Sequence, residues 1–229
     1  MSRSKVLAII PAYNEEACIA DTVNELKDLA PDVDFIIVND GSSDSTHDIC
    51  RENGYPCLNL SVNCGLTLAF QTGMKYAARQ GYQYAVQFDA DGQHRPEFIS
   101  SMLSRLTQDN LDIVIGSRFL TEAKGSSARM LGARLITFII KMTTGQRISD
   151  PTSGFRLYNR RMIEAFSMDS SLNPEPETLA RLIRKGASVA EVQVSMRERE
   201  TGESYLTFSK SISYMMRTCT SILFVQWFR

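Results

Sequence analysis

Residues 85–91 read AVQFDAD, a short apolar run that ends in two carboxylates. Similar runs occur at Val6–Ile10, Phe35–Val38 and Asp112–Ile115, and each precedes turn-forming residues and then helix-like sequence. Apolar runs without polar alternation fit strands that are covered by helices on both faces, and their alternation with helices predicts a mostly parallel, Rossmann-like α/β sheet. Ligands of such sheets bind beyond the carboxyl ends of the strands, so we expect the functional residues directly after each run.

The composition is that of an ordinary globular protein, with 43% hydrophobic and 22% charged residues. A net charge of -1 gives no overall basic character, so nucleic acid is not an expected partner. Five cysteines lack CxxC spacing and are interpreted as free thiols of a cytoplasmic protein. No run reaches the roughly 18 to 20 apolar residues of a membrane-spanning helix, and no signal-peptide pattern precedes Pro11.

Two carboxylates, Asp89 and Asp91, stand at the predicted ligand edge. Their oxygen atoms suit one hard divalent cation, which would neutralise charge on a leaving diphosphate. Gln93 and His94 lie within reach as additional ligands. The alternative is that this stretch caps a helix that begins at Pro96, and for an isolated tripeptide that alternative would be preferred. Other motifs accompany it here.

The second loop, residues 38–46, reads VNDGSSDST. We expect Asp40 to face the crevice, where its carboxylate could accept hydrogen bonds from a base or a ribose. The alternative is an Asx turn in which every polar group is satisfied locally. Asp44 or Ser45 is placed to cap the helix that follows.

The first loop, residues 11–15, reads PAYNE. Tyr13 could stack on a flat ring, and Glu15 could contact a nucleotide. The alternative is that Asn14 caps the next helix and that the acidic residues favour its positive end. Both interpretations can hold together.

The joint occurrence of these three loops, in this order and at these distances, resembles family 2 glycosyltransferases of the GT-A fold. Within that family the chain looks most like the polyprenyl-phosphate glycosyltransferases, typified by dolichyl-phosphate mannose synthase. The motifs that carry this resemblance are 89–94 (DADGQH), 116–118 (GSR), 150–156 (DPTSGFR) and 197–204 (RERETGES). The resemblance covers nearly the whole chain, and it implies a GT-A catalytic domain over residues 1–206 followed by an amphipathic helical tail over residues 207–229.

The resemblance also implies roles for individual residues. The implied ligands of Mg²⁺ or Mn²⁺ are Asp89, Asp91 and Gln93, and the implied donor-binding residues are Pro11, Tyr13, Glu15, Asp40, Asp89 and Asp91. The implied contacts to the acceptor phosphate are Arg118, Arg129 and Arg199. The implied catalytic residues are Asp91, Asp150, Arg118 and Arg199. Guanidinium groups suit phosphate because they present a fixed fork of donors. Asp150 either orients a nearby arginine, assists catalysis or starts a turn before Pro151.

The implied reaction is inverting transfer of a hexose or N-acetylhexosamine from a nucleotide sugar, with uridine as the expected nucleoside, to a polyprenyl phosphate for cell-envelope polysaccharide or glycoconjugate synthesis. A phosphate oxygen is already anionic and needs no general base. A saccharide hydroxyl as acceptor would need one, and Glu175 and Glu177 are then the candidates, unless they only favour a helix start. A non-catalytic GT-A binding module is disfavoured by the intact Asp89, Asp91 and Arg118, and a nucleotidyltransferase by the lack of a glycine-rich phosphate loop.

Attachment to the cytoplasmic face of a membrane is expected for such an acceptor. In Ser127–Gly145 the basic residues Arg129, Arg134 and Lys141 interrupt apolar residues at helical spacing, a pattern of an interfacial helix or of a core helix with snorkelling basic residues. The resemblance implies the interfacial helix, because the family places a membrane-facing helix here. The sequence shows no C-terminal transmembrane helices of the kind that many relatives carry, and residues 203–205 differ from the usual Ser-Lys. We therefore expect a peripheral membrane protein whose helix and tail meet lipid or a small membrane protein subunit, and a homo-oligomer is compatible with the sequence.

Overall fold

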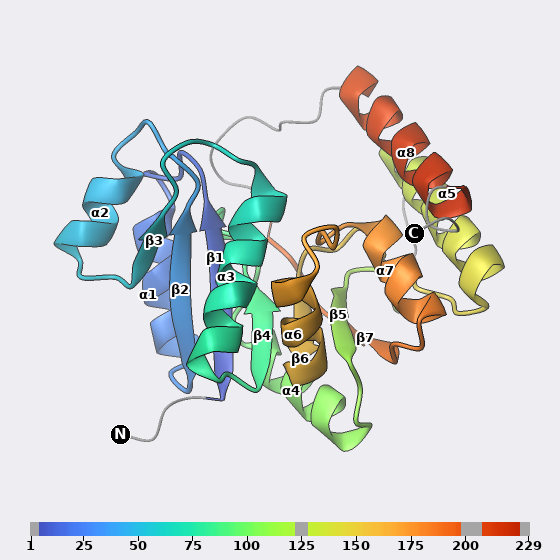
Figure 1. Ribbon diagram of the computed structural model, residues 1–229, viewed down its shortest axis with the longest axis horizontal. Coiled ribbons are helices and arrows are strands. Elements are labelled where there is room, and N and C mark those ends of the chain that lie inside the picture. The colour runs from blue at the N-terminus through green and yellow to red at the C-terminus, as the bar shows by residue number, and fades with distance from the viewer. Residues whose placement is uncertain (1–4, 122–127, 198–207, 225–229) are drawn as a thin grey trace.

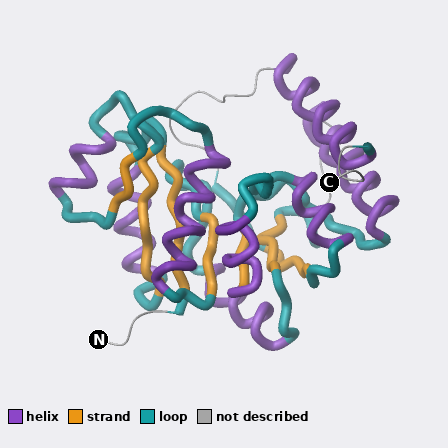
Figure 2. Tube along the Cα trace, viewed as in Figure 1, coloured by secondary structure: helices purple, strands orange, loops and turns teal. Residues whose placement is uncertain are grey.

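The computed structural model describes residues 5–121, 128–197 and 208–224, with side chains described from Met130 and Ser213 onward in the last two segments. Its centre is a seven-stranded sheet of order β3-β2-β1-β4-β6-β5-β7 (Figures 1 and 2). The strands are β1 (Val6–Ala12), β2 (Val33–Asn39), β3 (Cys57–Asn59), β4 (Tyr84–Gln87), β5 (Ile113–Ser117), β6 (Arg156–Asn159) and β7 (Val189–Gln193). Only β6 runs antiparallel to its neighbours, β4 and β5, so the mostly parallel sheet is confirmed.

Helices cover both faces of the sheet, as predicted (Figure 2). They are α1 (Ile19–Leu29), α2 (Thr46–Glu52), α3 (Leu66–Gln80), α4 (Phe98–Gln108), α5 (Ala128–Thr144), α6 (Arg160–Met168), α7 (Pro176–Arg184) and α8 (Phe208–Leu223). Helices α3 and α6 pack on one face, and α1 and α4 pack on the other. Helices α5, α7 and α8 gather beside the β5–β7 end of the sheet (Figure 1).

Strand β1 shows why the apolar runs lack polar alternation. Leu7 and Ile9 point into the core that contains α3 and α6, whereas Val6, Ala8 and Ile10 point into the core that contains α1 and α4. Successive side chains of a strand alternate between the two faces, so a strand between two helical layers needs apolar residues at every position.

The sequence located the long parallel strands to within a few residues but missed the short ones. Strand β3 has only three residues, and β6 reads RLYN, which has no long apolar run. The strand-like run over 188–196 forms β7 only from Val189 to Gln193, and the helix-like run over 177–185 forms α7. The segment 167–176 runs from the end of α6 through turns to the start of α7.

The C-terminal helix α8 packs against α5 and α7 (Figure 1). Gly132 of α5 makes this approach close, because a Cβ atom there would lie 1.4 Å from the Sδ atom of Met215. Cys219 and Ile222 of α8 join the same buried cluster as Ile140 of α5. The described part of the tail is therefore packed on the globular body, and the domain boundary at residue 206 stays a prediction.

Candidate functional site

The first and second loops are joined by hydrogen bonds at the carboxyl ends of β1 and β2. Asn14 has a left-handed φ of 56°, which asparagine tolerates, and its Oδ1 accepts from the Ser43 amide at 2.8 Å. The Glu16 carboxylate accepts from the Ser45 amide at 2.9 Å, while Asp44 accepts from the Glu16 amide at 3.1 Å. Asn14 therefore joins two loops, and the prediction that it caps the following helix is wrong because α1 begins at residue 19.

Two of the expected nucleoside contacts, Tyr13 and Glu15, flank Asn14 in this joined pair of loops. Both are partly exposed, as is Pro11 at the end of β1. Burial of Asp44 would raise the pKa of its carboxyl, but hydrogen bonds from Thr46 and from the Glu16 amide outweigh that effect and hold the pKa below its usual value. Asp44 therefore remains charged at the start of α2, as its expected capping role requires, while Ser45 makes no side-chain cap.

Asp40 does not face an open crevice, so that expectation is wrong. Its side chain belongs to a residue that is 3% exposed, and its two carboxylate oxygens accept from the amides of Cys64 and Gly65 at 2.8 and 2.7 Å. Gly41 allows the chain to pass close by, because a Cβ atom there would lie 2.5 Å from the carbonyl carbon of Val62. Asp40 thus fixes the loop that precedes α3. A bound nucleoside would have to share the carboxylate oxygens of Asp40 with these two amides.

The third loop carries the expected metal ligands. Asp89 follows β4 and is partly exposed, with Oδ1 accepting from the Gln87 amide group at 3.2 Å. Asp91 accepts from the Gln93 backbone at 3.1 Å, and the Gln93 side chain donates to the Arg197 carbonyl at 3.4 Å. The described part of the chain contains no cluster of three His, Cys, Asp or Glu side chains that could hold a metal ion. Two carboxylates and an amide oxygen instead fit a hard cation that completes its shell with substrate phosphate and water.

His94 follows the two carboxylates in this loop, and its ring lies largely buried beside Asp89. The residue is 3% exposed, and its Nδ1 accepts from the Asp89 amide at 2.9 Å. Its ring stacks on Phe155 with centroids 4.7 Å apart. Only Nε2 is left for a ligand, and it lies 3.5 Å from Oδ2 of Asp89, so His94 as an additional metal ligand stays a prediction.

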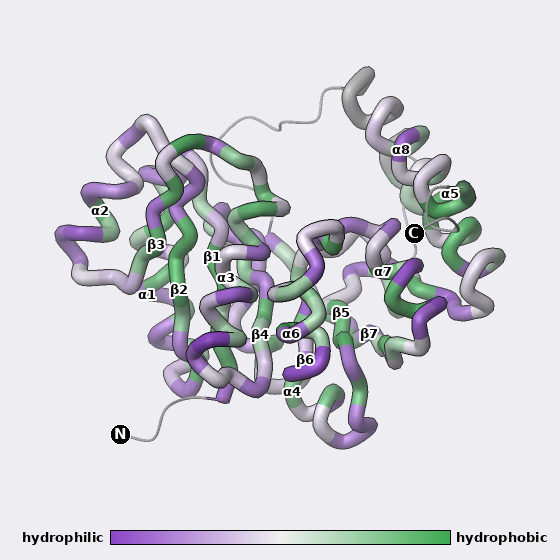
Figure 3. The backbone as a smooth tube through the Cα atoms, in the orientation of Figure 1, coloured by the Kyte–Doolittle hydropathy of each residue, from purple (hydrophilic) through white to green (hydrophobic). Residues whose placement is uncertain are grey.

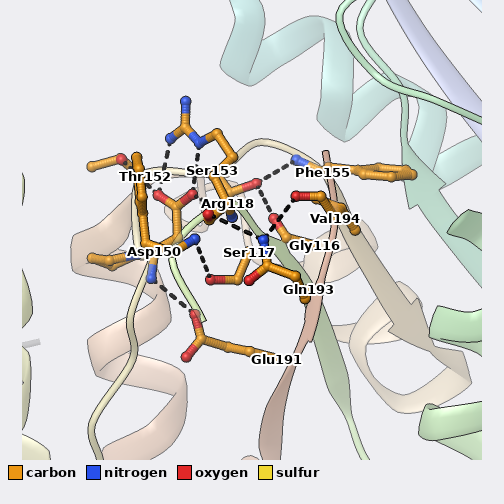
Figure 4. Close-up of polar contacts among 12 residues, drawn as sticks. Gly116, Ser117, Arg118, Asp150, Thr152, Ser153, Phe155, Glu191, Gln193 and Val194 are labelled. Atoms are coloured by element: carbon orange, nitrogen blue, oxygen red, sulfur yellow. Dashed lines mark hydrogen bonds and ion pairs between the residues drawn. The ribbon is translucent and has the colours of Figure 1, made fainter. Parts of the chain in front are cut away.

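Arg118 and Asp150 form the best-defined ion pair of the site (Figure 4). Asp150 is 0% exposed, and its carboxylate receives Nε and Nη2 of Arg118. The backbone amide of Arg118 and the hydroxyl of Thr152 donate to the same carboxylate, at 3.2 Å each. Of the roles considered for Asp150, the geometry supports orientation of Arg118.

Two residues of β7 that sequence reasoning missed hold this pair from below (Figure 4). The Glu191 carboxylate accepts from the amides of Ser149 and Asp150 at 2.7 and 2.8 Å. The Gln193 side chain donates to the Arg118 carbonyl at 3.1 Å. Only one signal was available in the sequence: the two residues stand two positions apart in a strand-like run and hence share one face.

A cavity of about 220 Å³ joins the metal loop to the two helices α5 and α8. Its polar lining includes Asp89, Gln93 and Arg118, and its apolar lining includes Met130, Ala133 and Ile136 of α5 and Met215 of α8. Tyr214 of α8 also lines it and donates to Glu175 at 2.5 Å. Burial, with the nearby negative charge of Glu175, raises the pKa of Tyr214, so this phenol remains protonated. The cavity therefore offers anion-binding and apolar surfaces together.

The remaining predicted residues are placed only in part. Arg199 lies outside the described residues, and Arg129 belongs to α5 but its side chain is not described. Glu175, one candidate base, already accepts the Tyr214 hydroxyl. The pKa of the other, Glu177, is raised by its burial, and its Oε2 has no hydrogen-bond partner among the described atoms.

Comparison with known proteins agrees with this arrangement. Residues 7–166 match the family described as Glycosyl transferase family 2. The chain therefore belongs to this family, which confirms the resemblance read from its motifs, and it is a glycosyltransferase.

Among its relatives, the undecaprenyl-phosphate mannosyltransferase of Micrococcus luteus is 29% identical over 215 residues, which cover 89% of this chain and 88% of the relative. The UDP-N-acetylglucosamine–dolichyl-phosphate N-acetylglucosaminyltransferase of Methanococcus voltae is 32% identical over 194 residues, which cover 73% of this chain and 74% of the relative. The solved mannosyltransferase PcManGT of Pyrobaculum calidifontis, in complex with GDP-Man and Mn²⁺, superposes with a TM-score of 0.63 at 16% identity. That match covers 90% of this chain but only 59% of PcManGT. It confirms the GT-A fold.

Proposed function

We propose that this glycosyltransferase transfers a sugar from a nucleotide-sugar donor to a polyprenyl phosphate. The observation that carries this proposal is the shared cavity, which is lined both by Asp89 and Arg118 and by apolar residues of α5 and α8. A polyprenyl phosphate combines an anionic head with an apolar chain and matches both surfaces. Two relatives named for undecaprenyl and dolichyl phosphate give further support.

The donor diphosphate would be bound through a divalent cation, Mg²⁺ or Mn²⁺, held by Asp89, Asp91 and Gln93. When bound, the ion supplies neutralisation of the charge that develops on the departing nucleotide. The oxygen donors of this loop support the assignment, as does the Mn²⁺ in the PcManGT structure. Residues 11–15 would hold the nucleoside. We propose that the donor is a uridine-linked hexose or N-acetylhexosamine. The M. voltae relative, which is named for a UDP-linked sugar, supports this choice of donor. The M. luteus relative is named for mannosyl transfer, so the assay includes GDP-linked sugars as well.

Catalysis would then depend on positioning and charge. The acceptor phosphate oxygen is anionic at neutral pH, so it attacks the anomeric carbon opposite the leaving nucleotide without a general base, and the configuration inverts. Arg118 uses Nε and Nη2 to bind Asp150, which leaves the Nη1 side of its guanidinium for phosphate. Arg129 and Arg199 are proposed as further phosphate contacts on the resemblance alone.

Helix α5 has one buried and one exposed apolar face, which corrects the simpler expectation of an interfacial helix. Ile136, Ile139 and Ile140 are buried in the protein core and are not lipid contacts. Leu131 and Phe138, in contrast, are 67% and 61% exposed. Residues three to four apart share a helix face, so the apolar sequence of α5 divides between the two sides.

We further propose that the outer face of α5 docks on a membrane surface. Its exposed apolar residues are Leu131, Leu135, Phe138 and Met142. The exposed Arg134 and Lys141 lie along the same stripe, a pattern that suits the headgroup level of an anionic leaflet. Figure 3 shows that α5 is largely hydrophobic although it lies at the edge of the molecule. No helix that the structure describes is long and apolar enough to cross a membrane.

One assay tests donor and acceptor together. The protein is incubated with UDP- and GDP-linked sugars, Mn²⁺ and either undecaprenyl phosphate or phosphate-free saccharides, and the products are identified by mass spectrometry. A sugar-phosphate lipid is the expected product. Transfer to saccharides with none to the lipid phosphate would replace the proposed acceptor and require a general base.

A further inference from the structure

We infer that His94 and Gln87 are positioning residues that hold the Asp89 carboxylate in the orientation in which it meets the divalent cation. This inference rests on the proposed metal site. Gln87 is the last residue of β4, His94 lies in the loop that follows, and both are buried.

One imidazole ring contacts Asp89 at two points. The His94 Nδ1 accepts the backbone N–H of Asp89 at 2.9 Å. An accepting Nδ1 places the proton of the neutral ring on Nε2, and this atom lies 3.5 Å from Oδ2 of the same aspartate. The ring therefore fixes the backbone of Asp89 and directs an N–H toward its carboxylate.

The ring itself cannot swing away from this position. It stacks on Phe155 with an interplanar angle of 17°, and it meets the edge of Phe88 with centroids 5.7 Å apart. Both phenylalanines are fully buried in the core that contains α1 and α4. Aromatic packing thus keeps His94 in the one orientation that serves Asp89.

Gln87 holds the other carboxylate oxygen. Its side chain is buried, and Nε2 donates to Oδ1 of Asp89 at 3.2 Å. The space for this contact comes from Gly154, where a Cβ atom would lie 3.1 Å from the Gln87 nitrogen and 3.3 Å from Oδ2 of Asp89. The two carboxylate oxygens are therefore contacted by two different buried side chains.

This arrangement favours cation binding because the ligand is ordered before the ion arrives. A free aspartate loses rotamer freedom when it binds a metal, whereas Asp89 has already lost it on folding. Groups that orient a metal-ligating carboxylate typically change metal affinity by about 10- to 100-fold when they are removed. We expect changes of that size here.

The test uses the full chain and Mn²⁺ alone, with the free ion followed by its electron paramagnetic resonance signal. His94→Phe keeps the stacked ring but removes both polar contacts, and Gln87→Met keeps similar bulk without the amide. Each variant should raise the Kd for Mn²⁺ about 10- to 100-fold. His47→Phe and Gln83→Met are matched controls, because both residues are exposed and lie away from Asp89. The controls should bind as the wild type does.

A second readout separates positioning from a general structural role. If only cation binding is weakened, turnover of the folded variants should return toward the wild-type value at saturating Mn²⁺. Folded variants that bind Mn²⁺ like the wild type would overturn the inference while leaving the metal site intact. A wild-type protein that binds no Mn²⁺ would overturn the metal site itself. If His94→Phe does not fold, the result for Gln87→Met decides.

Discussion

The guanidinium of Arg118 meets the carboxylate of Asp150 at two points, with Nε–Oδ2 and Nη2–Oδ1 distances of 2.7 and 2.9 Å. Asp150 is buried, while the Arg118 side chain is 32% exposed toward the cavity. A bidentate pair of this kind fixes the plane of the guanidinium as well as its position. The buried partner therefore controls how the exposed one is presented to an anion.

Asp150→Asn should lower turnover strongly without loss of the fold. The amide keeps the size of the side chain but loses the charge that orients Arg118, and a misplacement of about 1 Å can cost about 100-fold in rate. Steady-state kinetics with the proposed donor and lipid phosphate would measure the effect. The matched control is Asp112→Asn, because Asp112 is also buried and paired with an arginine, Arg161, but lies at the opposite end of β5 from Arg118. The control should lower thermal stability and leave turnover per folded molecule unchanged; equal losses of turnover in both variants would contradict the role.

Arg118→Lys should reduce turnover more than nucleotide binding. Lysine keeps the charge but has no planar fork, so it cannot satisfy Asp150 and phosphate together. Calorimetry with the nucleotide diphosphate should change little while turnover falls by at least about tenfold, since loss of one charge-assisted hydrogen bond is worth roughly 1.5–3 kcal/mol. The same result is expected for Arg199→Lys. A loss of nucleotide affinity as large as the loss of turnover would refute contact with the acceptor phosphate.

Asp91→Asn should abolish metal-dependent turnover and leave the fold nearly intact. It removes a charged ligand from a partly exposed loop and no core volume. EDTA should have the same effect on the wild type, and added Mg²⁺ or Mn²⁺ should reverse it. Asp109→Asn, at the exposed end of α4, serves as the control. Wild-type turnover by Asp91→Asn in the presence of metal would mean that the metal assignment is wrong.

The fold could be predicted from sequence because burial on two faces leaves a direct signature. Val6–Ile10 must be apolar at every position, whatever the details of packing. Strand β6 carries no such signature, since RLYN depends on its neighbours β4 and β5 for pairing. Short strands are set by tertiary contacts rather than by their own composition.

The site could be located from the sequence, but the direction of its side chains could not. Asp40 follows β2 as predicted, yet its carboxylate is taken up by amides of residues 64 and 65, and no local pattern encodes that contact. The orientation of the His94 ring could not be predicted either, because the ring stacks on Phe155, which comes from a distant part of the chain. In α5 the helical spacing was legible, but the choice between Ile136 and Leu135 as the buried residue depends on where α8 packs.

Leu135→Glu with Phe138→Glu should weaken binding to anionic liposomes. Both side chains are exposed, so the charges meet lipid without entering the core. Arg134 and Lys141 would each contribute about 1 kcal/mol of attraction at an anionic surface, and binding should therefore fall as salt rises. Sedimentation at low and high salt would measure it.

The control for this experiment is Met168→Glu, which changes an even more exposed apolar residue at the end of α6. It should sediment with liposomes as the wild type does. Ile136→Glu is unsuitable because it would place a charge in the core and destabilise the fold. If the wild type stays in the supernatant at low salt, direct lipid binding is wrong, and the outer face of α5 would be better explained by a protein partner.

Glu177→Gln should stabilise the protein at neutral pH. Burial, and to a lesser extent the nearby Glu175, raises the pKa of the Glu177 carboxyl in the folded state above its value in the unfolded chain. The folded state therefore binds the proton more tightly, so stability falls as pH rises from about 4.5 through the raised pKa. Glutamine removes this dependence. The melting temperature should rise at pH 7, by roughly 2–4 °C per kcal/mol in a chain of this size, and the gain should shrink toward pH 4.5.

Glu52→Gln, at an exposed position at the end of α2, should show no such gain. A gain for Glu177→Gln that is independent of pH would contradict the titration argument, and a large loss of turnover would restore Glu177 as a candidate base.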